Sequence, residues 1–116
     1  MVNRVILLGN LTADPEVRAT PKGVYVANLR MATNTYAGKD EGGNAKETTE
    51  FHRLVVFGRQ AEIAGEYLRK GGLLYVEGRL QTSSWDDAAT GVKKYRTEVV
   101  IDSFKMLGSK PQEVAA

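Results

Sequence analysis

A short segment, residues 48–59, places two aromatic rings and two cations on one side of a predicted strand. It reads T-T-E-F-H-R-L-V-V-F-G-R; Phe51, Arg53 and Phe57 occupy alternate positions, and Arg59 follows on the same parity. Successive side chains of a strand point to opposite faces, so these residues share one surface. Rings can stack on unpaired bases while cations meet phosphates. The segment therefore predicts a surface for single-stranded nucleic acid. The alternative is that both phenylalanines are ordinary core and Arg53 reaches solvent at an edge.

Other kinds of chemistry find little support in the residue types. The chain has no cysteine and a single histidine, His52, and its carboxylates show neither a nucleophile–base pairing nor the spacing of metal ligands. No glycine-rich loop of the phosphate-cradling pattern precedes a helix. We therefore expect a protein that is not an enzyme and that uses no metal and no cofactor.

The composition indicates one small globular domain. The 116 residues are 42% hydrophobic and 26% charged, which is enough to bury one compact core. The net charge of +2 only weakly favours a polyanionic partner, so the placement of the cations matters more than their sum. We find no secretory segment and no apolar run long enough to span a membrane, and we expect a cytoplasmic location.

Periodicity predicts five strands and one helix. The strands are expected at residues 2–13, 24–35, 48–59, 73–84 and 95–107, and the helix at residues 60–70. Polar, glycine-rich residues 37–47 and residues 85–94 are expected to form two long loops. The β-β-β-α-β-β order, with glycines that allow strands to bend, predicts an all-β fold with one short helix, a five-stranded Greek-key barrel of the OB type.

Strand parity also predicts which side chains face inward. In the fourth strand the inner set is Leu74, Val76, Gly78 and Leu80, and on the helix the stripe of Ala61, Ala64, Tyr67 and Leu68 is expected to pack. OB barrels bind oligonucleotides across the face of the second and third strands and the adjoining loops. Arg30 and Tyr36 have the outward parity of the second strand, and Trp85 opens the last loop, so they join the predicted site.

The sequence closely resembles the family of bacterial single-stranded DNA-binding proteins. Seven collinear blocks carry the resemblance: N-R-V-I-L-L-G-N-L at 3–11, D-P-E-V-R at 14–18, T-E-F-H-R-L-V-V-F-G at 49–58, A-G-E-Y-L-R-K-G at 64–71, V-E-G-R-L at 76–80, Y-R-T-E-V-V at 95–100 and M-L-G at 106–108. The resemblance implies an OB fold, a homotetramer and sequence-tolerant binding of single-stranded DNA during replication, recombination and repair at the nucleoid.

The resemblance also implies roles for individual residues. The base-stacking rings would be Phe51, Phe57 and Trp85, assisted by Tyr36. Phosphate contacts would come from Arg53 and Arg59 beside the stacking strand and from Arg4, Arg18 and Lys70 elsewhere. For Tyr75 the resemblance implies a contact between subunits, and for His52 a structural role. The residues themselves extend the expected subunit interface, because the first strand is apolar on both faces and the fourth strand has apolar side chains of outward parity; its members are Asn3, Ile6, Leu8, Leu73 and Tyr75.

Three departures from the family pattern carry expectations of their own. Residues 81–84 hold no cation where relatives are often basic, which predicts weaker phosphate attraction near Trp85, and Phe51 replaces a larger tryptophan. The chain ends at Ala116, so we expect a binding domain at 1–108 and a short polar tail at 109–116. Without an acidic tip, the sequence is either a trimmed chain or a member that does not recruit replication and repair proteins.

Two other binding functions remain open. Stacking is indifferent to the sugar, so an OB domain that binds RNA fits the same residues. A protein-docking module of primosome type is the other alternative, although it would leave the aromatic residues Phe51, Phe57 and Trp85 unexplained.

Overall fold

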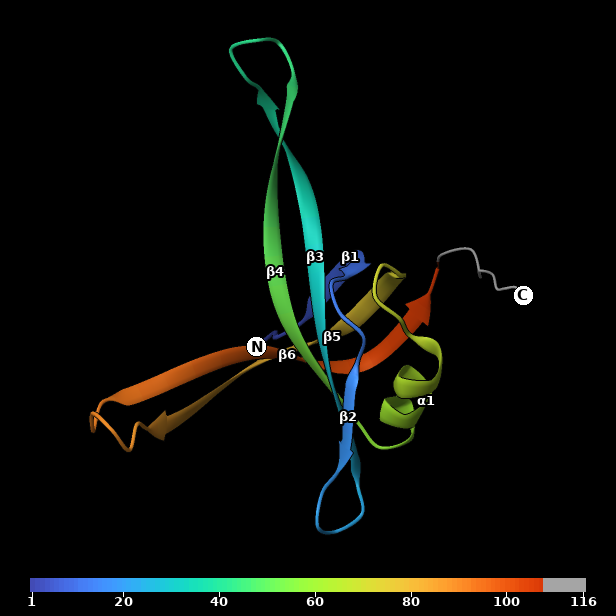
Figure 1. Cartoon of the computed structure of the whole chain (residues 1–116), viewed down its shortest axis with the longest axis vertical. Coiled ribbons are helices and arrows are strands. Elements are labelled where there is room, and N and C mark those ends of the chain that lie inside the picture. Colours follow the sequence, from blue (N-terminus) through green and yellow to red (C-terminus); the bar gives the residue numbers. More distant parts are fainter. Residues whose placement is uncertain (108–116) are drawn as a thin grey trace.

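The computed structural model describes residues 1–107, and its strands form a barrel with one short helix beside it (Figure 1). The elements are β1 (Val5–Leu11), β2 (Glu16–Ala19), β3 (Tyr25–Lys39), β4 (Ala45–Phe57), α1 (Arg59–Tyr67), β5 (Leu73–Asp86) and β6 (Lys93–Met106). The tail expected at residues 109–116 lies outside the described residues.

Five of the strands close into a ring. The neighbours run β1-β5-β6-β4-β3, and pairing of Asn10 and Leu11 in β1 with Ala32 and Met31 in β3 completes the circle. The β4–β6 pair is parallel, whereas the other pairs of the ring are antiparallel. The predicted five-stranded barrel with one short helix is therefore confirmed.

The barrel interior is filled by the inward side chains of every strand in the ring. The largest fully buried side chains are Leu29, Met31, Leu54, Leu74, Val56 and Val76. The helix adds Ala61 and Ala64, which are small enough to let α1 lie close to the sheet. The alternating pattern that predicted the inner faces of β3, β4 and β5 thus also describes the core.

Two glycines allow neighbouring strands of the ring to approach one another closely. A Cβ atom on Gly9 would overlap the carbonyl oxygen of Ala32, and one on Gly78 would overlap the carbonyl oxygen of Val100. Gly78 follows a shift in the β5–β6 register, because Glu77 pairs with Ser103 while Gly78 pairs with Ile101. The shift leaves Asp102 as an extra residue on β6, as in a β-bulge.

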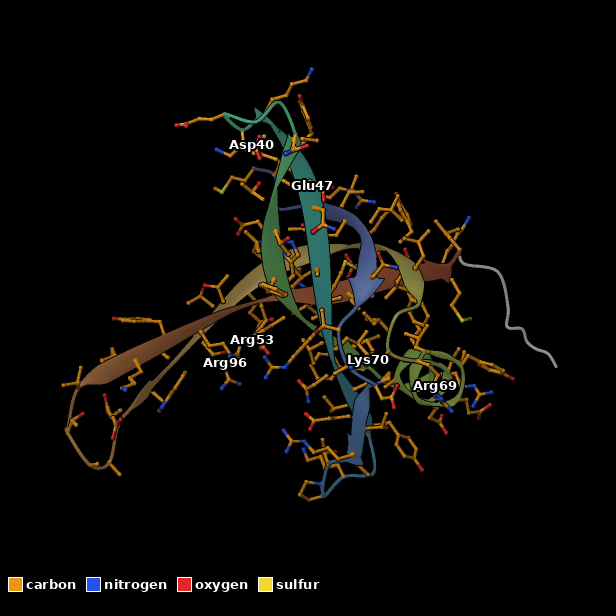
Figure 2. The ribbon with its side chains drawn as sticks, turned by 45° about the horizontal axis from the view of Figure 1, so that its top comes forward. Asp40, Glu47, Arg53, Arg69, Lys70 and Arg96 are labelled. Atoms are coloured by element: carbon orange, nitrogen blue, oxygen red, sulfur yellow. The ribbon has the colours of Figure 1, made fainter. Side chains whose placement is uncertain are left out.

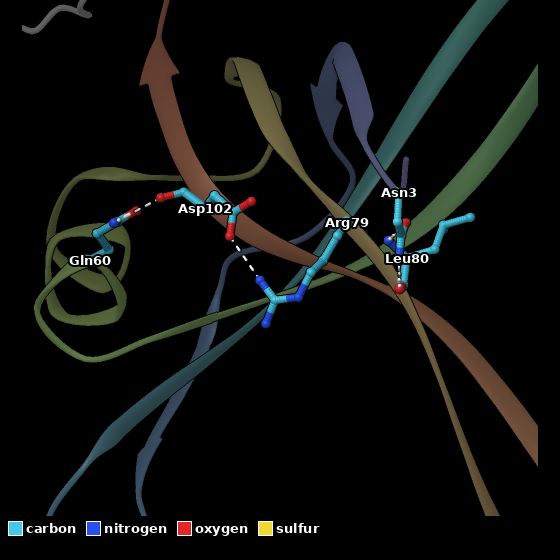
Figure 3. Close-up of polar contacts among 5 residues, drawn as sticks. All are labelled: Asn3, Gln60, Arg79, Leu80 and Asp102. Atoms are coloured by element: carbon cyan, nitrogen blue, oxygen red, sulfur yellow. Dashed lines mark hydrogen bonds and ion pairs between the residues drawn. The ribbon is translucent and has the colours of Figure 1, made fainter. Parts of the chain in front are cut away.

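The bulged Asp102 is held from two sides. Its carboxylate accepts a hydrogen bond from the Arg79 guanidinium at 2.8 Å, and its backbone carbonyl accepts one from the Gln60 amide at 3.1 Å (Figure 3). One partner belongs to β5 and the other to α1, so these contacts attach the helix to the bent part of the barrel.

The structure adds a strand that the sequence pattern does not indicate. The four residues of β2 pair with β3, from Glu16 opposite Asn28 to Ala19 opposite Tyr25. All four side chains of β2 are exposed. An edge strand this short, with no buried face, has no hydrophobic alternation by which it could be predicted.

The two long loops expected from the sequence are shorter in the structure. Residues 37–39, 45–47, 85–86 and 93–94 belong to strands, so only 40–44 and 87–92 remain as turns. The resulting β3–β4 and β5–β6 hairpins extend from the barrel as two arms in different directions (Figure 1). Polar pairs hold them, including Thr49 with Asn34 at 2.7 Å and Thr82 with Thr97 at 2.9 Å. Polar strand residues lack the apolar periodicity that predicts a strand.

The helix is shorter than predicted. It ends at Tyr67 rather than at residue 70, because the next residues bond elsewhere. The Lys70 backbone N–H donates to Asp14 and the Gly71 N–H donates to the Leu11 carbonyl. Arg69 donates to the carbonyls of Gly65 and Leu68 and thereby satisfies the helix end.

Two side chains expected to be buried are exposed. Tyr67 is 63% exposed on α1, so its assignment to the packed stripe is wrong. Leu80 is 50% exposed, although it lies opposite the buried Val99 and so keeps the inward parity. It lies where β5 leaves the barrel and becomes an arm, so the inward face has no core to contact there.

Candidate nucleic-acid interface

The two phenylalanines of β4 are exposed on its outer face. Phe51 is 74% exposed and Phe57 is 50% exposed, which excludes the alternative that both are ordinary core. Phe51 lies opposite Ala32 of β3, a side chain too small to cover the ring. The inward neighbours Leu54 and Val56 are buried. The segment therefore separates a core face from an aromatic face, as its alternation predicts.

One residue of this outer face differs from the expected pattern. Val55 shares the parity of Phe51, yet only 6% of it is exposed. It lies opposite the buried Val100 in the parallel β4–β6 pair. This junction makes the outer faces of β4 and β6 parts of one continuous surface.

Four arginines line a groove on that surface. The groove has a volume of about 320 Å³ and receives Arg18 from β2, Arg30 from β3, Arg53 from β4 and Arg96 from β6. Arg30 and Arg53 lie directly opposite one another in the β3–β4 pair. We call these residues the four-arginine groove; Figure 2 shows Arg53 and Arg96 close together in it. Like charges gathered at an open surface favour a polyanion.

Carboxylates share the walls of the groove, which limits its charge. Asp14, Glu16 and Glu98 also line it, so the local excess of positive charge is modest. A second hollow of about 230 Å³ shares Arg53 and Glu98 with the groove and is also lined by Phe51 and Leu80. An aromatic ring and the guanidinium groups thus line two neighbouring hollows.

Trp85 lies on the β5–β6 arm with a cation over its ring. The ring is 44% exposed, and the guanidinium carbon of Arg96 lies 5.5 Å from its centroid. This distance is within the range of a cation–π interaction. The arm therefore presents an indole beside the same arginine that lines the groove.

Tyr36 is exposed on the β3–β4 arm, away from the groove. The ring is 62% exposed and lies opposite Glu47, beyond Phe51 along the same outer face. Figure 2 shows Glu47 and Asp40 toward the tip of this arm. Tyr36 is available for stacking in acidic surroundings.

The structure does not bring every predicted cation to the groove. Arg59 is on α1 and pairs with Glu62 at 3.5 Å, and Arg4 pairs with Glu77 on the β1–β5 surface. Lys70 lies near α1, away from Arg53 in Figure 2. Any role of these three in binding requires a strand that continues past the groove.

Sequence reasoning missed residues on the first part of β6. Arg96 lines the groove, Lys94 lies opposite Trp85, and the exposed Tyr95 lies opposite Ser84. The available signal was their position at the end of the expected loop 85–94 and directly after it. Because that loop was expected to be irregular, no cross-strand register could be assigned.

The outer side of β1 and β5 forms a second, separate surface. Ile6 and Leu8 are 58% and 53% exposed, while Leu73 and Tyr75 are half-buried. Asn3 is tied to its own chain, because its amide exchanges hydrogen bonds of 3.0 and 2.9 Å with the Leu80 backbone (Figure 3). Apolar side chains exposed together on one sheet surface favour a protein contact.

A polar network borders this second surface. The Tyr75 hydroxyl donates a hydrogen bond of 2.6 Å to Glu77, which also pairs with Arg4. The hydrogen bond to Glu77 raises the pKa of Tyr75, and the same bond lowers the pKa of Glu77, with Arg4 acting in the same direction. At neutral pH the phenol is therefore neutral and the carboxylate ionised.

His52 makes a structural contact between two strands. Its Nε2 lies 2.8 Å from the hydroxyl of Thr33, across the β3–β4 pair.

Within residues 1–107, no cluster of three or more metal-ligating side chains occurs. In the same part of the chain, no helix has the length and apolar character to cross a membrane.

Comparisons with known proteins identify relatives along nearly the whole chain. The model of the single-strand binding protein family matches residues 2–107. "Single-stranded DNA-binding protein 1" of Chlorobaculum tepidum is 50% identical over 109 residues, which cover 94% of this chain and 67% of that protein.

Solved structures agree with these relatives. The Plasmodium falciparum SSB in complex with single-stranded DNA superposes with a TM-score of 0.82 at 27% identity, covering 93% of this chain and 97% of that one. A deletion mutant of the single-stranded DNA binding protein from Thermus aquaticus gives 0.79 at 38% identity, covering 94% and 52%.

Proposed function

The chain belongs to the single-strand binding protein family, and we propose that it binds single-stranded DNA without strong sequence preference on the outer face of β3, β4, β6 and β5. Proteins of this family are DNA-binding proteins rather than enzymes. The observation that carries the proposal is the coexistence of exposed aromatic rings on β4 and β5 with the four-arginine groove between them.

The two kinds of side chain have complementary tasks. Bases of an unpaired strand stack on Phe51, Phe57 and Trp85, and every base has a face that can stack. The arginines contact phosphates, which are the same in every nucleotide. Neither contact reads a base edge, so binding tolerates any sequence. Tyr36 extends the aromatic face along the β3–β4 arm.

The biological consequence follows from this mode of binding. A strand whose bases and phosphates are bound cannot pair with its complement, and it is shielded from nucleases. We infer that the protein protects exposed single strands during replication, recombination and repair, at the nucleoid in the cytoplasm. Arg59, Arg4 and Lys70 contribute only where a strand continues beyond the groove.

Competition among nucleic acids tests the proposal. Fluorescence anisotropy of labelled oligo-dT should show tight binding that unlabelled oligo-dT displaces and a duplex of equal length does not. Oligo-rU serves as the third competitor, because stacking does not distinguish the sugar. Stronger competition by oligo-rU than by oligo-dT would support the RNA-binding alternative. Equal competition by the duplex and by oligo-dT would contradict the proposal that unpaired bases stack on the aromatic face.

Affinity is expected to fall steeply with salt. Each phosphate that a cation neutralises releases counterions, with a logarithmic slope of about −0.7 per phosphate for single strands. Binding isotherms for oligo-dT from low to moderate salt measure this slope. If the slope is flat, the arginines do not contact phosphates.

Replacing Ser83 and Ser84 with lysine is expected to steepen that slope, because both lie next to Trp85. Glu66→Lys, at an exposed position of α1, changes the net charge by the same +2 away from Trp85 and serves as the control. An equal change from the double variant and from Glu66→Lys would indicate a general charge effect instead of a local one.

We also propose that the protein assembles as a homotetramer. The exposed Ile6 and Leu8 and the half-buried Leu73 and Tyr75 support this, with Asn3 at the border of the same surface. Burying these side chains against a second copy would remove apolar area from water.

Light scattering of the wild-type chain should therefore give the mass of a tetramer at micromolar concentration. Leu8→Lys should shift the mass toward smaller species, because it places a charge on the apolar surface. Val24→Lys, on an exposed valine before β3, is the matched control and should not. A monomeric wild type would refute the proposed homotetramer. A stable dimer would show that only one of its two kinds of interface forms.

A further inference from the structure

Arg96 is common to two parts of the surface that otherwise lie on different elements. Its guanidinium carbon is 5.5 Å from the centroid of the Trp85 ring. The same side chain lines the four-arginine groove with residues of β2, β3 and β4. It therefore connects the indole on the β5–β6 arm with the cations at the centre of the surface.

The strand register explains this position. Arg96 lies directly opposite Ser83, and Trp85 follows Ser83 by two residues on the same face of β5. A diagonal neighbour at this spacing is within reach of a long side chain. The cation that is missing from β5 before Trp85 is thus present on β6, across the hairpin.

The second cation of this region is engaged differently. Lys94 lies opposite Trp85, but its ammonium pairs with Asp87 at 3.3 Å. Among residues 1–107, the ion pairs do not include Arg96, which is exposed. Its charge remains available to a phosphate while the flat guanidinium lies over the ring.

We propose that Arg96 is a positioning and phosphate-binding residue that joins Trp85 to the groove. The guanidinium holds one face of the indole, so that a base stacks on the opposite face. Its charge meets a phosphate of the strand that passes from Phe51 across the groove to Trp85. The inference rests on the proposed function, and it names the residue that links base stacking on Trp85 with phosphate binding in the four-arginine groove.

The alternative is that Arg96 is an ordinary surface cation. A cation–π contact at an exposed site is weak, so it need not order the ring. In that case removal of the guanidinium would leave the emission of Trp85 unchanged. It would change the salt slope of binding no more than removal of any other surface charge does. The two explanations differ in measurable ways because Trp85 is the only tryptophan.

Three variants test the proposal. Arg96→Gln removes charge and guanidinium, Arg96→Lys keeps the charge alone, and Lys22→Gln removes one charge from the turn before β3 as the matched control. The readouts are Trp85 emission without DNA, the affinity for oligo-dT, and its salt slope. Thermal unfolding of each variant checks that the fold is retained.

Arg96→Gln should shift Trp85 emission in the free protein and lower affinity about tenfold at low salt, the size expected when stacking and one phosphate contact are weakened together. Its salt slope should be shallower by about 0.7, the value for one phosphate on a single strand. Arg96→Lys should restore the slope but not the full emission spectrum. Lys22→Gln should resemble the wild type.

The possible failures are distinguishable. Unchanged emission in Arg96→Gln would overturn the positioning role, and a slope equal to that of the wild type would overturn the phosphate contact. Failure of Arg96→Lys to restore the slope would also count against that contact. If the wild type itself does not bind oligo-dT, the proposed function fails, whereas the emission of the free variants still tests the contact between Arg96 and Trp85.

Discussion

Phe51→Ala is expected to weaken oligo-dT binding by about 1–3 kcal/mol, the range known for base–aromatic contacts in OB-fold single-strand binding proteins themselves. The melting temperature should change little, because the ring is 74% exposed and lies opposite Ala32. Truncating a phenylalanine in the core would instead cost about 3–5 kcal/mol of folding free energy. Binding isotherms and thermal unfolding of the same variant separate these outcomes.

Two companion variants make the result specific. Phe51→Trp should bind at least as tightly as the wild type, because the larger ring offers a wider stacking face. Tyr67→Ala removes another exposed aromatic ring, on α1, and should leave binding unchanged. An equal loss of affinity in Phe51→Ala and Tyr67→Ala would contradict the assignment of stacking to β4.

Gly78→Ala is expected to destabilise the barrel by about 3 kcal/mol, the upper end of the usual cost of overpacking. The added Cβ would overlap the carbonyl oxygen of Val100 and lie 2.9 Å from its carbonyl carbon. Backbone atoms cannot rotate away as a flexible side chain can, so β5 and β6 would have to separate at the bulge. Urea unfolding measures the loss.

Gly42→Ala is the matched control for Gly78→Ala. A Cβ at Gly42 would meet only side-chain atoms, at 3.4 and 3.5 Å, in the turn between β3 and β4. Its stability should therefore remain close to that of the wild type. Unfolding of Gly78→Ala at the urea concentration of the wild type would show that the close approach of β5 and β6 is not needed to close the ring.

Several parts of the fold are predictable because burial leaves a period in the sequence. Leu54 and Val56 alternate with Phe51, Arg53 and Phe57, and the structure places the first pair in the core and the exposed set outside. The barrel and its single helix also follow from the order of the apolar segments. Where one face of a strand packs and the other does not, the alternation identifies both.

The arms were not predictable for the same physical reason. Beyond the barrel both faces of β3–β4 and β5–β6 meet solvent, so Thr49 and Thr82 carry no apolar signal although they are paired. Leu80 keeps its parity but loses its core where β5 becomes an arm. Strand content there depends on hydrogen bonds and turn geometry, which hydrophobic periodicity does not report.

The candidate site shows the same division. Arg30 and Arg53 could be assigned to one face from parity alone, and the register places them opposite one another. Arg96 could not, because its neighbours across the hairpin depend on how many residues the turn contains. Arg18 could be assigned only from the family resemblance and not from parity, since it reaches the groove from β2, a strand with no buried face.

The most direct test of the central claim is Trp85 emission during titration with oligo-dT. Because Trp85 is the only tryptophan, its signal reports one position on the binding surface. Stacking of a base on the ring predicts quenching that saturates together with binding measured by anisotropy, and no such change with duplex of equal length. Saturated binding of oligo-dT with unchanged Trp85 emission would contradict the placement of Trp85 in the single-strand interface.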